Sequence, residues 1–153
     1  MTSMILVLAA AWAASGAGPT TGPAATAGAT AYKRQTGPAT VEVLRCDWTY
    51  PDRPRTVPAK IYYPATPREP APVIVFSHGL GGSRDGYEYL GRHWASWGYV
   101  SVHLQHPGSD SSVWKEHAGD QDAILAAMRR AAAKPDNALL RPLDVRLALD
   151  ELE

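Results

Sequence analysis

The segment Val73-Ile-Val-Phe-Ser-His-Gly-Leu-Gly-Gly82 decides the fold of this chain, because a strongly apolar run passes directly into a glycine-rich turn. The run from Val73 to Phe76 lacks polar alternation, which is typical of a central strand covered on both faces. The sequence His78-Gly-Leu-Gly-Gly82 then ends the strand. Because glycines let backbone N–H groups approach a ligand closely, the segment predicts a buried strand with backbone donors at its carboxyl end.

Length and composition predict one domain whose partner is a small molecule or a protein. The chain has 153 residues, of which 45% are hydrophobic, enough for one core but not for two domains. Its 15 basic and 15 acidic residues are scattered, so no surface for nucleic acid is expected. The single cysteine, Cys46, excludes an internal disulfide and a thiolate-rich zinc site.

The amino-terminal region predicts an exported protein, either secreted or periplasmic. Residues 1–31 carry no charged side chain and contain an apolar run from Met4 to Ala14, followed by Gly, Ala, Thr and Pro. This pattern is typical of a signal peptide and a flexible linker. The run is too short to cross a bilayer as a helix, so no stable membrane anchor is expected. A disordered Ala/Gly tail is the alternative.

The residues on either side of the Val73 strand predict an α/β fold. Residues 40–44 and 57–63 are expected to form an antiparallel hairpin at a sheet edge, joined by a turn at Pro51-Asp-Arg-Pro54. After the glycines, a helix capped by Ser83 or Asp85 has an apolar face made of Tyr87, Leu90, Trp94 and Trp97. A strand at residues 99–104 completes a parallel strand–helix–strand unit.

Two more helices are expected downstream. Asp120 and Asp122 begin a stretch that has basic residues near its end and stops at Pro135, which suits the helix dipole. A second apolar stripe, at Val145, Ala148, Leu149 and Leu152, predicts a helix that runs to Glu153. A domain of residues 40–153 is therefore expected, preceded by the signal peptide and linker of residues 1–31.

No serine of the chain lies in a Gly-x-Ser-x-Gly motif, the strained turn that presents a nucleophile in many hydrolases. Ser77 comes nearest, but branched Val75 stands where that motif needs a small residue, which disfavours Ser77 as the nucleophile. The third glycine and the acidic residue of a dinucleotide site are also missing, and no phosphate loop is present. No cofactor is expected.

The histidines allow a metal site or a structural role. His103 and His106, with Asp110 nearby, could bind a metal only if the chain bends, because strand residues three apart point to opposite faces. No metal is the preferred prediction. His78 is expected to order the turn through its ring nitrogens. The loop after His106 either lines a substrate pocket, with Ser109, Asp110 and Trp114 as substrate-binding residues, or is a plain structured loop.

Three segments resemble the α/β-hydrolase family, and within it the secreted branch similar to dienelactone hydrolases and platelet-activating-factor acetylhydrolases. These segments are Phe76-Ser-His-Gly-Leu-Gly-Gly82, Gly98-Tyr-Val-Ser-Val-His-Leu-Gln-His-Pro-Gly-Ser-Asp110 and Arg141-Pro-Leu-Asp-Val-Arg146. The resemblance extends from about Val41 to Glu153 and implies a serine ester hydrolase that acts on carboxylic esters or lactones through an acyl-enzyme. It also implies that the Leu80 amide, presented by Gly79, is the first oxyanion donor.

The resemblance further implies that the serine, acid and histidine of the family's triad follow the residues of this sequence. We therefore expect the amino-terminal part of a hydrolase sheet, truncated before the nucleophile strand and without ester hydrolysis of its own. The strand that begins at Val73 would then be an unprotected sheet edge. The alternative is a catalytically dead binding or interaction module on a partial hydrolase fold.

Overall fold

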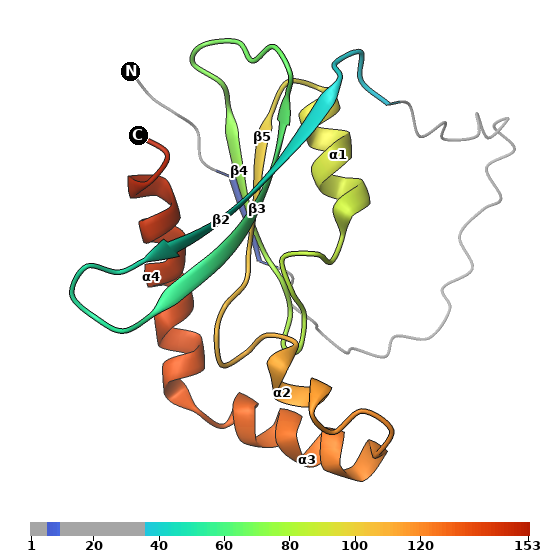
Figure 1. Cartoon of the computed structure of the whole chain (residues 1–153), viewed down its shortest axis with the longest axis vertical. Helices are drawn as coiled ribbons and strands as arrows, with labels where there is room; N and C mark the ends of the chain where they lie inside the picture. Colours follow the sequence, from blue (N-terminus) through green and yellow to red (C-terminus); the bar gives the residue numbers. More distant parts are fainter. Residues whose placement is uncertain (1–5, 10–35) are drawn as a thin grey trace, which may run out of the picture.

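The computed structural model describes residues 6–9 and 36–153, which form a mixed sheet with helices on both faces (Figure 1). The strand order is β1-β4-β5-β3-β2. The strands are β1 (Leu6–Ala9), β2 (Val41–Thr49), β3 (Thr56–Pro64), β4 (Val73–Ser77) and β5 (Val100–Leu104). The helices are α1 (Glu88–Ser96), α2 (Ser112–Lys115), α3 (Gln121–Ala132) and α4 (Pro135–Asp150). The predicted α/β fold class, a partial hydrolase-type sheet, is confirmed.

The two strand pairings predicted from the sequence are present. Strands β2 and β3 form an antiparallel hairpin, with β2 at the sheet edge. Strands β4 and β5 are parallel neighbours, and their register pairs Val73 with Val100 and Ser77 with Leu104. Because both strands end at the same edge of the sheet, the residues that follow Ser77 and Leu104 lie close together. A single bridge between Gly82 and Asp110 continues this pairing beyond the strands.

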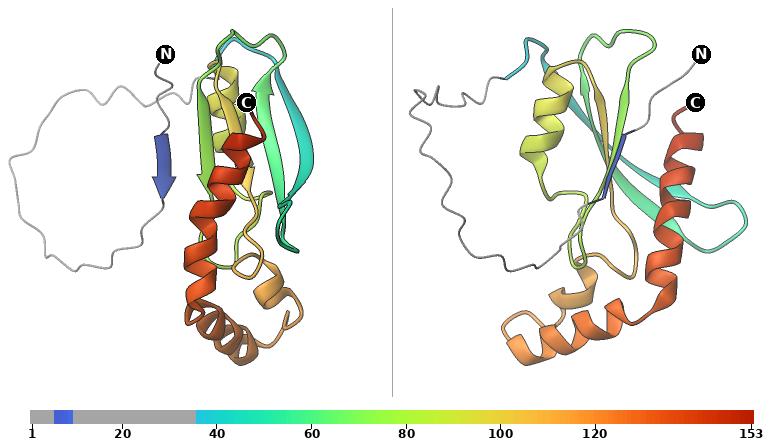
Figure 2. Two further views of the ribbon diagram at one scale, coloured as in Figure 1. Left: turned by 90° about the vertical axis from the view of Figure 1, so that its left-hand side faces the viewer. Right: turned by 180° about the vertical axis from the view of Figure 1, so that it is seen from behind.

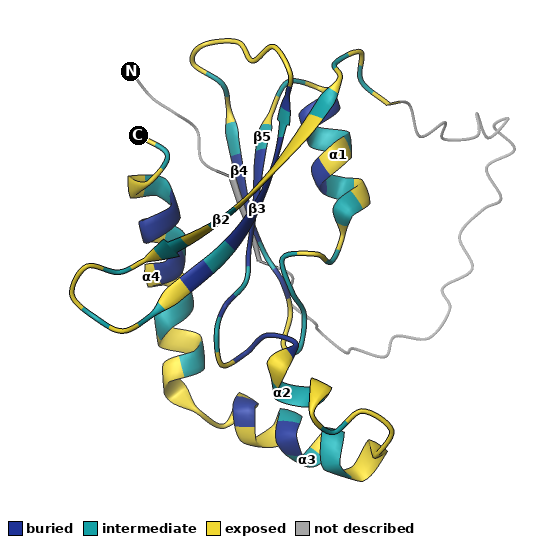
Figure 3. Ribbon diagram, in the orientation of Figure 1, coloured by how far each residue is buried: buried dark blue, intermediate teal, exposed yellow. Residues whose placement is uncertain are grey.

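Successive side chains along the strands point to opposite faces of the sheet, and both faces carry buried residues. One face packs against α4, where Leu147 and Ala148 contact a core made of Val57, Ala59, Ile61, Val75, Val102 and Leu104. The opposite face carries Tyr62, Phe76 and His103 and packs against α1. Figure 2 shows α4 in front of the sheet and α1 behind it, and Figure 3 shows that the middle of the sheet is the most deeply buried part.

Some elements differ from the sequence predictions. Helix α1 begins at Glu88, later than expected, because Tyr87 takes a left-handed conformation with φ of 59°. Tyr87 and Trp97 are half exposed, and the close contact with the sheet is made through Gly91, where a Cβ atom would lie 2.3 Å from the Tyr62 ring. Helix α4 continues through Pro142 and ends at Asp150, not at Glu153.

Strand β4 is not the edge of the sheet. The short strand β1 pairs with it in parallel, from Leu6 opposite Ile74 to Ala9 opposite Ser77. The expected unprotected edge is therefore covered by part of the predicted leader, whose other residues lie outside those described. Within residues 6–9 and 36–153, none of the helices has the length and apolar character needed to cross a membrane.

Candidate functional site

In the glycine turn (residues 78–82), the carbonyl groups of His78 and Gly81 are fixed, and the amides of Gly79 and Leu80 are free. The carbonyl oxygen of His78 accepts a hydrogen bond from Arg141, and that of Gly81 accepts one from the Trp114 indole at 2.7 Å. The Gly81 amide donates to Ser109 O at 2.8 Å. Among the residues described, no acceptor bonds the amides of Gly79 and Leu80. The turn thus presents two unpaired N–H groups where β4 ends.

His78 is buried and locked into one tautomer. Its Nδ1 lies 2.7 Å from Gly79 O, which can only accept, so Nδ1 carries the proton. Its Nε2 accepts the backbone N–H of His106 at 3.1 Å. Burial lowers the pKa of His78 to about 4, despite the opposing hydrogen bond to Gly79. The neutral ring therefore connects the glycine turn to the first residues beyond β5.

The loop beyond β5 contacts the glycine turn through residues that the sequence singled out. Asp110 is 5% exposed, and its carboxylate accepts from the Gln105 amide at 2.7 Å and from the Ser112 N–H at 3.1 Å. Ser109 is buried, and its hydroxyl donates to His106 O at 3.3 Å. Asp110 and Ser109 thus hold the loop, and their substrate-binding role stays a prediction, as does that of Trp114.

A second set of polar residues, largely missed from the sequence, joins α4 to the same edge of the sheet. Asp144 of α4 is fully buried and forms two hydrogen bonds with Arg55, at 2.7 and 2.6 Å. Asp144 Oδ2 also lies 2.8 Å from His106 Nδ1, and His106 Nε2 lies 3.0 Å from Ser77 Oγ. The proximity of Ser77 and His106 could have been predicted, because the parallel pairing of β4 and β5 places the residues that follow Ser77 and Leu104 side by side.

In this second set of polar residues, the negative charge of Asp144 is balanced by Arg55. Burial raises the pKa of Asp144, but the hydrogen bonds from Arg55 and His106 outweigh this effect, and the net pKa is lowered. Burial lowers the pKa of His106, against the hydrogen bond to Asp144, which favours the protonated ring. At neutral pH we therefore assign a carboxylate to Asp144 and a neutral imidazole to His106.

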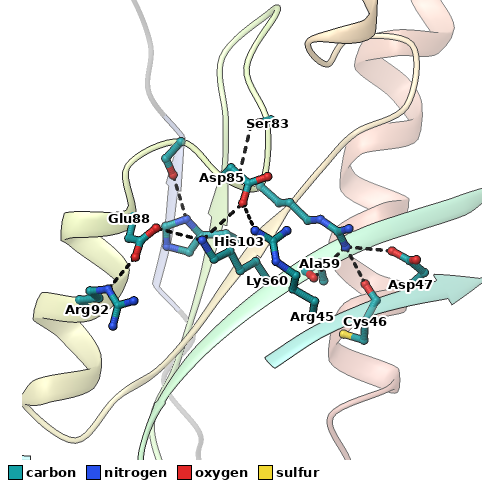
Figure 4. Close-up of polar contacts among 12 residues, drawn as sticks. Arg45, Cys46, Asp47, Ala59, Lys60, Ser83, Asp85, Glu88, Arg92 and His103 are labelled. Atoms are coloured by element: carbon teal, nitrogen blue, oxygen red, sulfur yellow. Dashed lines mark hydrogen bonds and ion pairs between the residues drawn. The ribbon is translucent and has the colours of Figure 1, made fainter. Parts of the chain in front are cut away.

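The segment that leads from the glycine turn to α1 is fixed to the hairpin by ion pairs (Figure 4). Arg84 donates to the carbonyl oxygens of Cys46 and Ala59, each at 3.0 Å, and to Asp47 at 2.8 Å. Next to it lies a series of ion pairs in which positive and negative side chains alternate, in the order Arg45, Asp85, Lys60, Glu88 and Arg92. These contacts hold the chain after the turn against β2 and β3, and so restrict the turn from its other end.

His103 and His106 lie in different surroundings. His103 packs between Tyr62 and Phe76 on the α1 face, whereas His106 belongs to the α4 face with Asp144. In the part of the chain that the structure describes, no three His, Cys, Asp or Glu side chains are placed to bind a metal together. The geometry therefore gives no support to the alternative metal site.

One comparison with known proteins supports the fold described above. No curated protein matches the chain. The family model described as platelet-activating factor acetylhydrolase, isoform II, matches residues 46–131, which are more than half of the chain and include β3, β4, α1, β5, α2 and all of α3 except its last residue. The chain therefore belongs to the platelet-activating factor acetylhydrolase isoform II family of α/β hydrolases.

Proposed function

We propose that this chain supplies the oxyanion-binding part of a serine ester hydrolase, with the Leu80 N–H as first donor. The unpaired amides of Gly79 and Leu80 carry the proposal, because an oxyanion site needs donors that no protein acceptor has taken. Leu80 is 37% exposed, so a carbonyl group can approach from solvent. The fixed carbonyl groups of His78 and Gly81 keep the donors oriented before any substrate arrives.

The neighbouring residues have supporting roles in this proposal. Gly79 leaves open space beside the turn, since a Cβ atom there would have no neighbour within 4 Å. His78 orders the turn through its two hydrogen bonds and acts neither as acid nor as base. Ser109, Asp110 and Trp114 border the substrate. The family's name points to a small acetyl ester, and we extend this to short carboxylic esters or lactones.

The proposal assigns no nucleophile for steady-state turnover to these 153 residues, which lack a Gly-x-Ser-x-Gly motif. The same observation favours the alternative, a binding module without catalysis on a hydrolase sheet. Sequencing the native gene beyond the Glu153 codon distinguishes the two. A frame that encodes Gly-x-Ser-x-Gly, then an acid and a histidine, supports the hydrolase, and a stop without such a remnant supports the module. The proposal also includes export of the protein, as predicted from residues 1–31.

The role of Leu80 can be tested by joining this chain to the nucleophile-bearing half of a characterised family member and measuring p-nitrophenyl acetate hydrolysis. Leu80→Pro removes the N–H, and we expect kcat to fall by roughly 10²–10³, the usual effect of losing one oxyanion donor. Leu80→Ala keeps the N–H and should retain kcat. Equal activity of the two variants would show that this amide does not bind the oxyanion.

A further inference from the structure

Ser77, His106 and Asp144 form a continuous hydrogen-bonded chain across three elements. Ser77 ends β4, His106 follows β5 and Asp144 lies on α4. The distances are 3.0 Å from Ser77 Oγ to His106 Nε2 and 2.8 Å from His106 Nδ1 to Asp144 Oδ2. A hydroxyl, an imidazole and a carboxylate in this order are the arrangement that activates a serine. These residues are separate from the glycine-turn amides, and the order along the chain differs from the serine–acid–histidine order that the family resemblance implies.

In the hydrogen-bonded series Ser77–His106–Asp144, the position of each proton follows from whether the neighbouring atom can donate or only accept. The Asp144 carboxylate can only accept, so the neutral His106 ring must carry its proton on Nδ1. His106 Nε2 then has a free lone pair, and the Ser77 hydroxyl must donate to it. The Ser77 proton therefore already points at a base, and the oxygen lone pairs point elsewhere.

The three side chains differ in access to solvent. His106 and Asp144 are 0% exposed, whereas Ser77 is only partly buried. Part of Ser77 is therefore within reach of an electrophile from solvent, whereas its base has no exposed surface. The carboxylate is also paired with Arg55, which reduces its ability to stabilise a protonated His106. These features allow one proton transfer and oppose a repeating cycle.

We propose that Ser77 is a base-activated nucleophile that takes up one acyl or phosphonyl group and retains it. With an ester, Ser77 Oγ forms a bond to the carbonyl carbon, the bond from that carbon to the alkoxy oxygen breaks, and His106 Nε2 takes the Ser77 proton. The proton then leaves with the alcohol. With a fluorophosphonate, the Oγ–P bond forms, the P–F bond breaks, and the proton that His106 Nε2 takes from Ser77 leaves with the fluoride.

Hydrolysis of the adduct is slow for a structural reason. Removing the acyl group requires a water molecule that gives its proton to His106 Nε2 as it attacks. Because Asp144 also pairs with Arg55, it stabilises a protonated His106 poorly, and His106 is therefore a weak base for activating that water. The site therefore reacts once and shows no steady-state ester hydrolysis, which is compatible with the function proposed above.

The test treats the full chain with a short alkyl fluorophosphonate and locates the adduct by peptide mass spectrometry. We expect one phosphonyl group on the peptide that contains Ser77, and none there in Ser77→Ala. Ser83→Ala is the matched control, because Ser83 is also partly buried but bonds an amide instead of a histidine. His106→Gln should slow labelling by about 100-fold, the usual contribution of a general base. Absence of a Ser77 adduct, or an unchanged rate in folded His106→Gln, overturns the proposal.

A measurement on the unaltered chain remains decisive if His106→Gln does not fold. The groups facing His106 are Asp144 and Arg141 from α4, Arg55 from the hairpin and His78 from the glycine turn. Burial lowers the pKa of His106, so labelling should be constant from pH 8 to about 6.5 and decline only under more acidic conditions. A rate that instead rises about tenfold per pH unit with hydroxide would mean that His106 is not the base.

Discussion

Gly79 and Gly81 lie two residues apart in the glycine turn, yet the structure requires glycine at only one of these positions. Gly81 has φ of 77°, and a Cβ atom there would lie 2.9 Å from the end of the Met128 side chain and 3.1 Å from the Trp114 ring. Gly79 has open space around its Cα. Gly81 is thus needed to build the turn, whereas Gly79 leaves room beside it.

This difference predicts opposite results for two alanine variants. Gly81→Ala should lower the free energy of unfolding by roughly 1–3 kcal/mol, because alanine is strained at a positive φ and must displace Met128. Gly79→Ala should change it by less than about 0.5 kcal/mol. Urea unfolding monitored by tryptophan fluorescence measures both values. A larger loss in Gly79→Ala than in Gly81→Ala would refute this explanation of the turn.

Sequence reasoning found the glycine turn but not the residues that hold it from a distance. The turn is contiguous, and its glycines signal an unusual backbone without help from other segments. Asp144 and Arg55, by contrast, are 89 residues apart and lie in ordinary helix and hairpin sequence. Each alone looks like a solvated charge, so their pairing appears only when the chain is folded.

Helix α4 is attached to the sheet by a buried charge as well as by its apolar stripe. Asp144 bonds Arg55 and His106, and Leu147 and Ala148 complete the core one turn later. Asp150, on the same helix, is exposed and has only a 3.9 Å contact with Arg146. The helix therefore offers an internal comparison between a buried and an exposed carboxylate.

Asp144→Ala should lower the free energy of unfolding by about 3–5 kcal/mol, because it leaves the Arg55 charge, whose side chain is only 13% exposed, without its partner. Asp150→Ala should alter stability by no more than about 0.5 kcal/mol. Chemical denaturation of both variants at pH 7.5 tests this prediction. A mild effect at Asp144 would show that the apolar stripe alone holds the helix.

Strand β1 covers one side of β4, so its removal should change association. A chain that begins at residue 36 leaves the outer N–H and C=O groups of β4 unpaired, and such edges recruit other strands. We expect this shortened chain to form dimers or larger species at concentrations where the full chain does not. Sedimentation velocity of the two proteins measures the difference, and two identical monomer profiles would contradict the expectation.

The elements that the sequence predicted well are those with strong local signals. Residues 73–77 and 100–104 are apolar and bounded by prolines or glycines, and α3 is capped by Asp120, whose side chain accepts from the Ala123 N–H at 3.0 Å. Helix α2 has only four residues, too few for a periodic pattern. Pro142 obscured the first half of α4, because proline inside a helix is usually a stop signal.

On the scale of the whole molecule, buried neutral histidines make the fold sensitive to acid. Burial lowers the pKa values of His78 and His103 to about 4, below the value of 6.5 expected in an unfolded chain. As pH falls below 6.5, the unfolded chain takes up these protons before the folded protein does. Acid therefore favours unfolding, and the effect ends near pH 4, where the folded protein also becomes protonated.

We predict that the free energy of unfolding is greatest above pH 6.5 and falls by roughly 3 kcal/mol per histidine between pH 6.5 and 4. Urea unfolding at intervals across this range provides the measurement. In His78→Asn, whose side chain can still donate to Gly79 O, roughly 3 kcal/mol of the acid-dependent loss should disappear. A stability that does not change between pH 6.5 and 4.5 would exclude this coupling.

The 89-residue separation of Arg55 and Asp144 also affects how the protein is made. During synthesis the hairpin emerges first, and its arginine must stay in water until α4 follows, because the contact closes most of residues 36–153 into one loop. Any pause in translation before residue 144 thus leaves the α4 face of the sheet bare on the ribosome. Such nascent chains expose apolar strands to chaperones and to one another until α4 arrives.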